Sequence, residues 1–312
     1  MKTLILAPEY FNESARNVFS SFSEVDVKKL DRNELLNIVK DYEIVAIRVD
    51  TKVDKDFLNA ATKLKVITTA TIGLDHIDVE YAKSLGVEVV SLQGGNVAPT
   101  AEYVFALMLS LLRKVPSAHN HILKGKWERH NFIGENLSGK VLGVVGFGRI
   151  GQHVAKIAQA FGMKVVAYDP YVDVHVFVNN NVQRLSMNDV LACSDVVTLH
   201  MLLTEETKGM FTKEKFDMMK SNSVFINCSR GGVVDESALV NALEYGEISG
   251  AALDVFVDEP LSQYSRLVEY AELYDNLILT PHIAGSTKES VHEAGLDVAE
   301  KARRFLYEVS NE

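Results

Sequence analysis

Short apolar runs alternate with amphipathic segments along the amino-terminal third of the chain. Each run has the length of a buried strand, and each intervening segment has the spacing of a helix that buries one face. The predicted strands are Thr3–Ala7, Val25–Lys28, Ile44–Arg48, Val66–Ala70 and Val87–Ser91. Helices are predicted between them, among them Asn33–Lys40, Asp54–Ala61 and Val79–Leu85, with Gly86 as the C-cap of the last. This alternation predicts a parallel sheet flanked by helices.

The pattern changes at Gly94–Pro99, which we interpret as a linker. A helix is predicted from Thr100 to Arg113, and because apolar residues occupy almost all of its sides, we expect it to be buried at a domain or subunit junction. Further strands are predicted beyond it, at Val141–Val145, Lys164–Tyr168, Val196–His200, Ser223–Asn227, Gly250–Asp254 and Leu277–Thr280, followed by a last helix at Ser286–Tyr307. The chain is therefore predicted to be an α/β protein with two parallel-sheet units.

The segment from Lys140 to Pro170 has the pattern of a complete dinucleotide-binding unit. Between its two strands, GFGRIG places Gly146, Gly148 and Gly151 in the spacing G-x-G-x-x-G at the start of an amphipathic helix. The first glycine would allow a tight turn, the second the close approach of backbone to a pyrophosphate, and the third the close packing of helix on strand. The free N–H groups and the positive end of the helix dipole attract phosphates.

The residue at the end of the second strand indicates which dinucleotide binds. Asp169 stands where a carboxylate accepts hydrogen bonds from a ribose diol, and its charge would repel the 2′-phosphate of NADP. The next arginine along the chain is Arg184, so no cation close in sequence favours that phosphate. We therefore predict NAD as the cofactor, in preference to NADP.

Composition and charge narrow the class of protein. At 312 residues the chain can form two domains, and its formal net charge of −10 argues against binding to nucleic acid or to an anionic membrane surface. No apolar run approaches the roughly 20 residues that span a bilayer, and the opening MKTLILAPEYF predicts a β-strand rather than a signal peptide. Cys193 and Cys228 lie in apolar, strand-like contexts without metal-ligand spacing, so we predict free thiols, no metal site and a cytoplasmic location.

Three segments at predicted strand ends carry residues suited to catalysis. Parallel strands bring their carboxyl ends to one edge of a sheet, where ligands bind, so we expect these segments to converge on the cofactor. Arg230 offers a planar fork for a carboxylate. Glu259 precedes a proline, and Asp254 is placed to accept hydrogen bonds from a nicotinamide carboxamide or a ribose. His282 follows a strand and a proline, and histidine is well suited to proton transfer near neutral pH.

Each of these residues also has a plainer interpretation when it is taken singly. Arg230 could form a surface salt bridge, the two acids could be solvated loop charges, and His282 could be structural. Together, however, they fit hydride transfer at a carbon that carries an oxygen next to a carboxylate. In that hypothesis His282 exchanges the hydroxyl proton, Glu259 orients His282, and Arg230 holds the carboxylate and polarises the carbonyl.

These segments resemble the D-isomer-specific 2-hydroxyacid dehydrogenase family over nearly the whole chain. The blocks LGVVGFGRIG, INCSRGGVVDE, AALDVF with the following EP, and LTPHIAGST stand in the family's order. The resemblance implies a catalytic triad of Arg230, Glu259 and His282. It also implies contacts to NAD, which we expect at Thr100, Gly146, Gly148, Arg149, Ile150, Gly151, Asp169, Met201, Cys228, Ser229, Arg230, Asp254, His282 and Gly285.

The resemblance further implies that ATIGLD is the substrate loop. There the backbone N–H groups of Ile72 and Gly73 would bind the substrate carboxylate, with Arg230 and His282 as the other substrate contacts. A glycine-containing turn after a strand forms an anion nest, although it can equally be a plain βα turn.

The domain organisation that the resemblance implies is two Rossmann-like or flavodoxin-like parallel-sheet domains. Residues 1–96 plus 286–312 would form a discontinuous substrate domain, and residues 97–285 the NAD-binding Rossmann domain. A hinge between them would close over the substrate and exclude water. We expect a homodimer, or a higher homo-oligomer, with Trp127 in the dimer contact. One departure from the family's pattern is Leu202, where a proline is usual near the adenosine, so cofactor affinity could differ.

Several small-molecule substrates fit the family. Arg48, at a strand end, is expected to face the cleft, where a second cation suits a further phosphate or carboxylate. NCSRGGVVDE and LTPHIAGSTKES are most similar to the phosphoglycerate dehydrogenase branch of serine biosynthesis, whereas TATIGLDHID with AEYVFALML is similar to the erythronate-phosphate branch. We favour oxidation of D-3-phosphoglycerate, with glyoxylate/hydroxypyruvate reduction and the oxidation of D-lactate or erythronate 4-phosphate as alternatives. Because the chain ends at residue 312, we expect no appended regulatory domain.

A hypothesis from a different class is a non-enzymatic NAD-sensing binder. The transcriptional corepressors related to this family dock partner peptides, and they carry disordered tails that we do not expect here. A His282→Ala variant separates the two hypotheses, because it should abolish an enzyme's turnover and leave cofactor binding and peptide docking intact.

Overall fold

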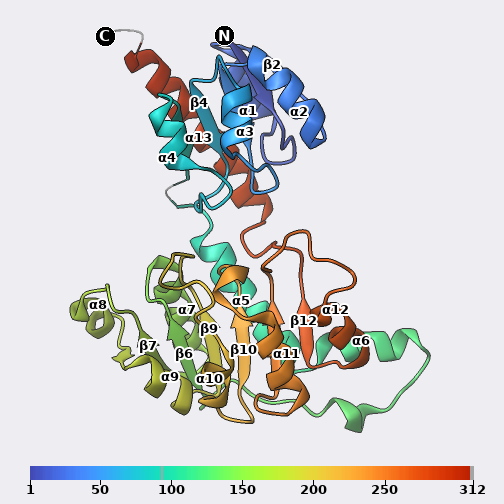
Figure 1. Ribbon diagram of the computed structural model, residues 1–312. Helices are drawn as coiled ribbons and strands as arrows, with labels where there is room; N and C mark the ends of the chain where they lie inside the picture. The colour runs from blue at the N-terminus through green and yellow to red at the C-terminus, as the bar shows by residue number, and fades with distance from the viewer. Residues whose placement is uncertain (93, 310–312) are drawn as a thin grey trace. The chain divides into compact units, whose positions relative to one another are not determined.

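The computed structural model describes residues 1–92 and 94–309 (Figure 1). Contacts between Cα atoms divide the chain into two compact units. Unit 1 is formed by Met1–Asn96 together with the segment that starts at Ser286, and unit 2 is formed by Val97–Gly285. Unit 1 is therefore built from two pieces of chain that are far apart in the sequence.

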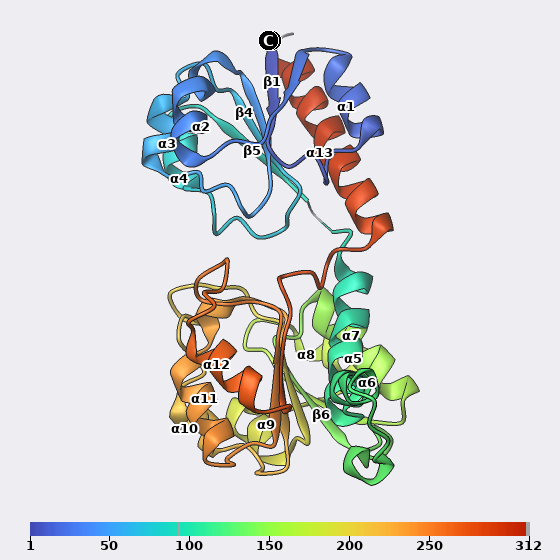
Figure 2. The same cartoon turned by 90° about the vertical axis from the view of Figure 1, so that its right-hand side faces the viewer.

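Unit 1 is a five-stranded parallel sheet in the order β2-β1-β3-β4-β5 among the described residues. Its strands are β1 (Lys2–Ile5), β2 (Glu24–Val27), β3 (Ile44–Ile47), β4 (Val66–Thr69) and β5 (Glu88–Ser91). Figure 2 shows two helices on one face of this sheet, α1 (Glu13–Ser20) and α13 (Lys288–Val309). The other face carries α2 (Arg32–Ile38) with the short 3-10 turn η1 (Val39–Asp41), α3 (Lys55–Ala60) and α4 (Val79–Ser84).

Strand β3 (IVAI) in the middle of the unit 1 sheet is buried on both faces and entirely apolar, whereas the edge strand β2 (EVDV) is partly exposed and carries two acidic residues. Leu4 of β1 packs in the cluster under α2 and α3, whereas Ile5 packs in the cluster under α1 and α13. The two sequence pieces are joined tightly, because a Cβ at Gly295 of α13 would lie 2.1 Å from the carbonyl oxygen of Tyr10. Only glycine allows this approach of the helix to the chain before α1.

Unit 2 is a seven-stranded parallel sheet in the order β12-β11-β10-β9-β6-β7-β8 within the described part of the chain. Its strands are β6 (Val141–Val145), β7 (Lys164–Tyr168), β8 (Gln183–Arg184), β9 (Val196–Leu199), β10 (Val224–Asn227), β11 (Gly250–Leu253) and β12 (Leu277–Leu279). One face is covered by α5 (Val97–Leu112), α7 (Arg149–Ala160) and α8 (Val174–Asn179), and the other by α9 (Met187–Cys193), α10 (Lys213–Asp217), α11 (Glu236–Glu244) and α12 (Arg266–Leu273) (Figure 2).

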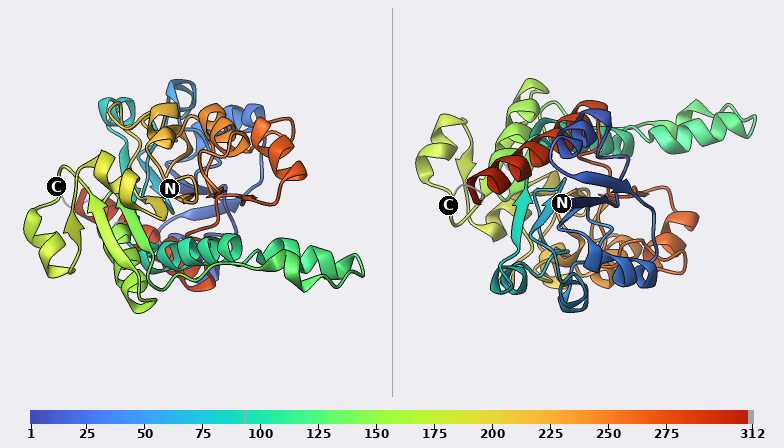
Figure 3. Two further views of the ribbon diagram at one scale, coloured as in Figure 1. Left: turned by 90° about the horizontal axis from the view of Figure 1, so that it is seen from below. Right: turned by 90° about the horizontal axis from the view of Figure 1, so that it is seen from above.

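A segment after α5 extends away from the sheet of unit 2. It consists of α6 (Val115–Leu123) and a loop that contains the 3-10 turn η2 (Arg129–Phe132), and Figure 3 shows it as an arm projecting sideways from the rest of this unit. Large apolar side chains stand in solvent along the arm, with Leu123 71% exposed, Trp127 76% and Ile133 77%.

Three expectations from the sequence are wrong in detail. The helix α5 begins at Val97 rather than Thr100, because Pro99 lies in its first turn, where no backbone N–H is needed. It is also not buried on every side, since Glu102 and Ala106 are exposed. Cys193 is the last residue of α9 and partly exposed rather than in a strand, although both cysteines are free thiols as predicted.

The predicted strands otherwise correspond to the observed ones, but several were predicted one or two residues too long at their carboxyl ends. Arg48, His200 and Asp254 each follow directly after the last residue of a strand. The residues that carry chemistry therefore lie in loops at the carboxyl edge of each sheet. Among the described residues, none of the helices combines the length and apolar character that a membrane crossing requires.

Candidate functional site

The turn between β6 and α7 is shaped by its three glycines. Gly146 has a φ of +93°, and a Cβ there would lie 2.6 Å from the carbonyl oxygen of His200. A Cβ at Gly151 would lie 2.3 Å from the carbonyl oxygen of Gly146, so α7 packs as closely as it can on the turn. Gly148, in contrast, has no heavy atom within 4 Å of the Cβ position. The middle glycine thus leaves open space in front of the turn.

The start of α7 is available to a ligand. Gly148 is its N-cap and has no side chain to accept a hydrogen bond from the first N–H groups of the helix. Arg149 and Ile150 form the first turn. Unsatisfied N–H groups at a helix start bind anions, which agrees with the predicted position of a pyrophosphate.

Asp169, directly after β7, holds the neighbouring loops through its carboxylate. Its Oδ2 accepts a hydrogen bond from the N–H of Phe147 at 2.8 Å, and its Oδ1 accepts from the N–H groups of Tyr171 at 2.9 Å and Val172 at 3.1 Å. The fold also brings Arg184 close to this residue, since its Nη2 donates to the Asp169 carbonyl oxygen at 3.1 Å. The sequence distance between Asp169 and Arg184 therefore hid a nearby cation.

Arg230 lies in a loop after β10 that a buried asparagine organises. The Oδ1 atom of Asn227 accepts hydrogen bonds from the N–H of Ser229 at 2.9 Å and from its hydroxyl at 2.7 Å. The Nδ2 atom of Asn227 donates to the carbonyl oxygen of Arg230 at 2.9 Å. The next residue, Gly231, is pressed against the loop after β11, because a Cβ there would lie 1.9 Å from the carbonyl carbon of Phe256.

Glu259 and His282, two of the predicted catalytic side chains, are in direct contact. The Nδ1 atom of His282 lies 2.6 Å from Oε2 of Glu259, with the side chains 28% and 32% exposed respectively. The other oxygen of Glu259 accepts from the N–H of Phe256 at 3.0 Å. Burial by itself would raise the pKa of Glu259, but the hydrogen bond and charge of His282, the Phe256 amide and the Arg230 charge outweigh it and lower the pKa.

Two further predicted cofactor residues lie beneath this pair. Asp254 is fully buried, and burial raises its pKa even though Thr280, two backbone N–H groups and the His282 charge oppose that shift. Cys228 is buried as well, and its burial, together with the charge of Asp254, raises the pKa of the thiol. Cys228 is therefore a neutral thiol that lines the site and not a nucleophile.

The remaining predicted cofactor positions are spread along the same sheet edge. Met201 follows β9 and packs at the margin of the core on the α9–α12 face. Thr100 is buried in the first turn of α5, and Gly285 is the last residue of unit 2. The carboxyl ends of β6, β7, β9, β10, β11 and β12 thus carry nearly all of the residues predicted to bind the cofactor or catalyse the reaction.

The predicted substrate residues Arg48, Ile72 and Gly73 lie in unit 1, after β3 and β4. The loop that contains Ile72 and Gly73 is held by side chains: the Thr71 hydroxyl donates to the carbonyl oxygen of Gly73 at 2.8 Å and lies 2.8 Å from the Thr69 hydroxyl. This oxygen of Thr69 lies 3.2 Å from Nε2 of His76. Sequence patterns gave no reason to single out these three polar residues.

Arg48 points over an aromatic ring at the same edge of unit 1. Its Cζ lies 3.9 Å from the centroid of the Tyr10 ring, and its Nη2 donates to the hydroxyl of Ser286 at 3.3 Å. A pocket of about 450 Å³ opens beside it at the ends of β1, β2 and β3. Basic side chains that follow β2 and β3 line its walls, namely Lys29, Arg32, Arg48 and Lys52, together with the acidic side chains of Glu9, Asp31 and Asp50.

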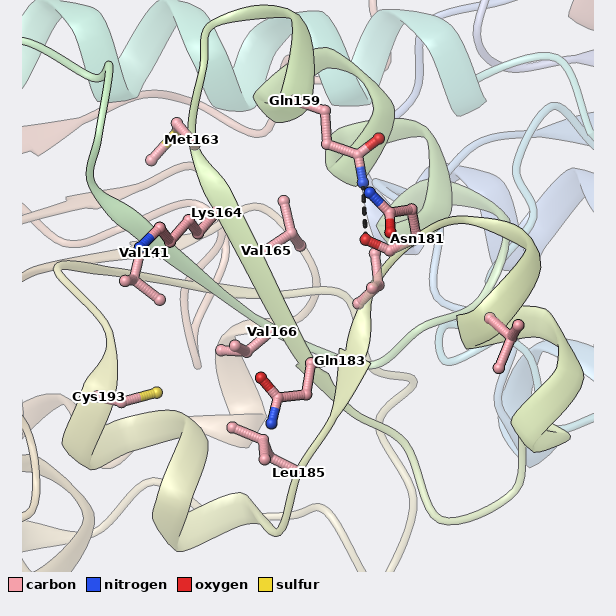
Figure 4. A pocket seen from close by; sticks show the side chains of 12 residues that line it. Val141, Gln159, Met163, Lys164, Val165, Val166, Asn181, Gln183, Leu185 and Cys193 are labelled. Atoms are coloured by element: carbon pink, nitrogen blue, oxygen red, sulfur yellow. Dashed lines mark hydrogen bonds between the residues drawn. The ribbon is translucent and has the colours of Figure 1, made fainter.

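Another pocket lies away from all of these residues. It has a volume of about 850 Å³ and opens at the amino ends of β6 and β7, where Val141, Lys164 and Cys193 contribute to its walls (Figure 4). Gln159 closes one side by donating to the carbonyl oxygen of Asn181 at 3.2 Å. None of the predicted site residues lines it, so it is not part of the candidate site.

Comparison with known proteins identifies the family. Residues 105–284 match the family described as "D-isomer specific 2-hydroxyacid dehydrogenase, NAD binding domain". Over 96% of its length the chain is 41% identical to the D-3-phosphoglycerate dehydrogenase of Archaeoglobus fulgidus, of which it covers 56%. It is 40% identical over 97% of its length to the D-3-phosphoglycerate dehydrogenase of Synechocystis, of which it covers 54%. The chain belongs to the D-isomer specific 2-hydroxyacid dehydrogenase family.

The chain spans about half the length of these curated relatives. Its fold is also that of solved members of the family. The D-lactate dehydrogenase of Aquifex aeolicus, solved in complex with NAD and lactic acid, is 30% identical, covers 98% of this chain with 96% of its own length, and gives a TM-score of 0.88. The glycine turn, Asp169 and the loops after β9 to β12 all fall within the matched NAD-binding domain of this dehydrogenase family.

The structure of this family member also contains polar residues that sequence reasoning passed over. Asn227 was predicted as the end of an apolar strand, and Thr280 as the end of another, yet the side chain of each makes a hydrogen bond that holds a loop. The sequence contains a signal for each of them. Asn227 and Thr280 are polar residues that end an apolar run shortly before a predicted site residue, and apolar packing gives no reason for a polar side chain there.

Proposed function

We propose that this chain is an NAD-dependent dehydrogenase of D-2-hydroxy acids, with D-3-phosphoglycerate as the favoured substrate and 3-phosphohydroxypyruvate as its product. The observation that carries the proposal is the pair formed by His282 and Glu259, at 2.6 Å, beside Arg230 at the carboxyl edge of the NAD-binding domain. The identity of 41% to a D-3-phosphoglycerate dehydrogenase supports the choice of substrate.

The residues present fit NAD. The open space in front of Gly148 admits a pyrophosphate against the backbone, and the first N–H groups of α7 have no side-chain cap. Asp169 presents a carboxylate beyond β7 for a ribose diol. Bound there, NAD would supply the acceptor for a hydride from C2 of the substrate.

In the proposed mechanism, His282 moves the proton of the reacting hydroxyl. Because Nδ1 of His282 faces the carboxylate of Glu259, Nδ1 carries a proton and donates a hydrogen bond to that carboxylate. Nε2 is then the unprotonated nitrogen and acts as the base. In the oxidation direction Nε2 accepts the hydroxyl proton, and the adjacent Glu259 stabilises the resulting imidazolium. In reduction His282 returns that proton to the carbonyl oxygen.

Arg230 and the loop of unit 1 bind the acid in this proposal. The guanidinium of Arg230 holds the carboxylate and polarises the C2 oxygen, for which a planar fork is better suited than an ammonium group. For the N–H groups of Ile72 and Gly73 we retain the role that the family resemblance implies, which is to bind a substrate carboxylate. Cations beside the pocket near Tyr10, with Arg48 foremost, suit the phosphate of a phosphorylated acid.

The experiment is a panel of acids assayed with NAD and NADH, including D-3-phosphoglycerate, hydroxypyruvate, glyoxylate, D-lactate and erythronate 4-phosphate. We expect the largest kcat/KM with D-3-phosphoglycerate. His282→Ala and Glu259→Gln should lower kcat by about 100-fold or more, as expected on loss of a general base or its partner. His175→Ala, a change of an exposed histidine on α8, is the matched control and should leave kcat unchanged.

Activity with unphosphorylated acids only would contradict the choice of substrate, and activity with none would contradict the enzyme hypothesis. If NADH binds to wild type and to His282→Ala alike and no acid turns over, the NAD-sensing binder becomes the better reading. The two outcomes are separated by the same set of measurements.

We also propose that the chain forms a homodimer through the arm of unit 2. Three large apolar side chains on the arm, Leu123, Trp127 and Ile133, are each more than 70% exposed, which favours a partner surface. Trp127→Glu should shift sedimentation from dimer to monomer, whereas Tyr264→Glu, at a similarly exposed aromatic outside the arm, should not. A cytoplasmic location remains a prediction from the cysteine content.

A further inference from the structure

One peptide group after β11, the group that joins Phe256 to Val257, is held by the chain that leads from β10 to α11. Gly231 packs directly against it, because a Cβ at Gly231 would lie 1.9 Å from the carbonyl carbon of Phe256 and 2.0 Å from the carbonyl oxygen. The N–H of the same peptide group, on Val257, donates to Oε1 of Glu236 at 2.8 Å. Close packing therefore fixes the position of this peptide group, and the hydrogen bond fixes its orientation.

Both contacts come from the segment that carries Arg230. Gly231 directly follows Arg230, and Glu236 is the first residue of α11. The start of this helix is capped, since the carboxylate of Asp235 accepts a hydrogen bond from the N–H of Ala238 at 3.0 Å. A capped first turn is well ordered, so Glu236 presents its carboxylate from a fixed backbone.

Glu259 depends on the neighbouring amide. Its Oε1 accepts from the N–H of Phe256 at 3.0 Å, while its Oε2 lies 2.6 Å from Nδ1 of His282. The amides of two consecutive residues thus each donate to a carboxylate, the first to that of Glu259 and the second to that of Glu236. A rotation of the peptide group at Val257 would therefore move the amide that orients Glu259 toward His282.

The position of Glu236 is not explained by favourable charge interactions. Burial raises the pKa of Glu236, and the charges of Asp258 and Asp235 raise it further, whereas the Val257 amide is the group among the described residues that opposes them. The fold therefore keeps this carboxylate beside two others, and the hydrogen bond from Val257 is the contact that stabilises its charged form there.

We propose, on the basis of the proposed function, that Glu236 is a positioning residue that fixes this peptide group and so holds Glu259 in place relative to Arg230. In the proposed mechanism the side chains of Glu259 and Arg230 serve one substrate, so their spacing has to match the acid, and a small misplacement slows the reaction. The plainer interpretation of Glu236 is an acid in the first turn of a helix, where it stabilises the positive end of the helix dipole. That interpretation predicts an effect on stability and none on catalysis.

The test is Glu236→Ala, which removes the acceptor of the Val257 N–H. We expect kcat/KM for D-3-phosphoglycerate to fall by about tenfold, the effect of one lost hydrogen bond to a charged group, and the NADH dissociation constant to stay within about threefold of wild type. Glu236→Gln keeps an acceptor oxygen and should recover kcat/KM to within about threefold of wild type. Glu244→Ala is the matched control, because it removes a carboxylate from the other end of the same helix, where Glu244 accepts from Nη2 of Arg266 at 3.3 Å. It should leave kcat/KM unchanged.

The Val257 amide gives a readout that does not depend on turnover. Labelling with ¹³C-carbonyl phenylalanine and ¹⁵N-valine selects Phe–Val pairs, of which the sequence contains two, Phe177–Val178 and Phe256–Val257. Val178→Ile, at an exposed position of α8, identifies the first signal by its loss. The Val257 amide should exchange with solvent about tenfold faster in Glu236→Ala than in wild type, whereas the Val178 amide should exchange at the same rate in both.

The contact between Glu259 and His282 gives a second readout without substrate. In protein with ¹⁵N-labelled histidine, the low-field proton of His282 Nδ1 is identified by its loss in His282→Gln. It should be present in wild type, Glu236→Gln and Glu244→Ala, and shifted or absent in Glu236→Ala. If wild type oxidises none of the acids, the proposed function fails, and this signal still decides whether Glu236 positions Glu259.

Two results would overturn the positioning role. The first is faster exchange at Val257 in Glu236→Ala with kcat/KM and the His282 signal unchanged, because the hydrogen bond would then hold the peptide group without affecting Glu259. The second is a kcat/KM in Glu236→Gln as low as in Glu236→Ala, because the charge of Glu236 and not its hydrogen bond would then be what matters.

Discussion

The three glycines of the β6–α7 turn should respond to alanine in three different ways. Gly148→Ala adds a methyl group where no heavy atom lies within 4 Å, and the backbone there, with φ −70° and ψ −164°, is open to any residue. Gly151→Ala places the methyl 2.3 Å from the carbonyl oxygen of Gly146. Gly146→Ala places the methyl group 2.6 Å from the carbonyl oxygen of His200, and it does so at a φ of +93°, which is unfavourable for a residue with a side chain. The space around each Cβ position therefore distinguishes Gly148, which we expect to matter for ligand binding, from Gly146 and Gly151, which we expect to matter for folding.

The magnitudes follow from these contacts. Overpacking costs about 1–3 kcal/mol, so Gly151→Ala should lower the free energy of unfolding by that amount, and Gly146→Ala by more because about 1–2 kcal/mol of backbone strain is added. Gly148→Ala should leave the free energy of unfolding unchanged or raise it by about 0.4–1 kcal/mol, since alanine restricts the unfolded chain. If a pyrophosphate lies on this backbone, the same methyl should weaken NADH binding by about 10- to 100-fold.

Two measurements on each variant decide the matter: urea denaturation without cofactor, and a titration of NADH fluorescence. We expect Gly148→Ala to lose affinity without losing stability, and Gly151→Ala to lose stability. Wild-type NADH affinity in Gly148→Ala would refute the reasoning, because it would show that no ligand approaches the open face of this glycine. So would a loss of stability in Gly148→Ala as large as that in Gly151→Ala.

Three further predictions concern single side chains. Arg230→Lys keeps the charge but loses the planar fork, and it should lower kcat/KM by about 10- to 100-fold in steady-state assays without a comparable change in the NADH dissociation constant; an unchanged kcat/KM would contradict its role in binding the acid. Asp169→Asn removes the charge that opposes a 2′-phosphate, so the ratio of kcat/KM with NADP to that with NAD should rise by about tenfold, helped by Arg184 nearby; a constant ratio would show that Asp169 does not select the cofactor. Lys220→Met should make the protein more sensitive to acid. Burial would raise the pKa of Asp195, but Lys220 at 2.8 Å and the Val141 amide outweigh it and lower the pKa. The carboxylate of Asp195 therefore stabilises the fold above its unfolded pKa, and this stability is lost as the pH falls through its folded pKa. Without Lys220 the pKa of Asp195 is lowered less, and the acid midpoint followed by circular dichroism should move to higher pH.

The sequence predicted the arrangement of strands and helices well because both sheets are buried on two faces. Strands such as Ile44–Ile47 and Val196–Leu199 are fully buried, so they appear in the sequence as apolar runs, in which Thr198 is the one polar residue. The ends of the runs were less informative. The apolar pattern continues past the last residue of the strand into the buried start of the loop, which is why strands were predicted to include residues such as Ala70 that lie beyond them.

The sequence predicted that Glu259 acts on His282, but it did not predict the contacts around the other candidate site residues. That Arg184 reaches the carbonyl oxygen of Asp169 depends on the short edge strand β8, whose two residues give no clear pattern in the sequence. The burial of Asp254 depends on the turn at His282 folding over it, a long-range feature that local periodicity does not encode. Tertiary hydrogen bonds of this kind become visible only when the strands are placed side by side.

The loops at the edge of unit 2 show a common reason for these hidden residues. A loop that leaves a buried sheet carries backbone groups without ladder partners, and such groups must find others. The side chain of Asn227 forms hydrogen bonds with backbone groups in the loop of Arg230, and the carboxylate of Asp254 accepts hydrogen bonds from backbone N–H groups in the turn of His282. Both inner residues are 0% exposed, whereas the outer residue of each pair reaches toward solvent. The loop of Arg230 and the turn of His282 therefore each depend on two polar residues, an inner one that fixes the backbone and an outer one that is proposed to meet the ligand. Substitution of the inner residue should impair the outer residue without removing a group that is proposed to touch the substrate.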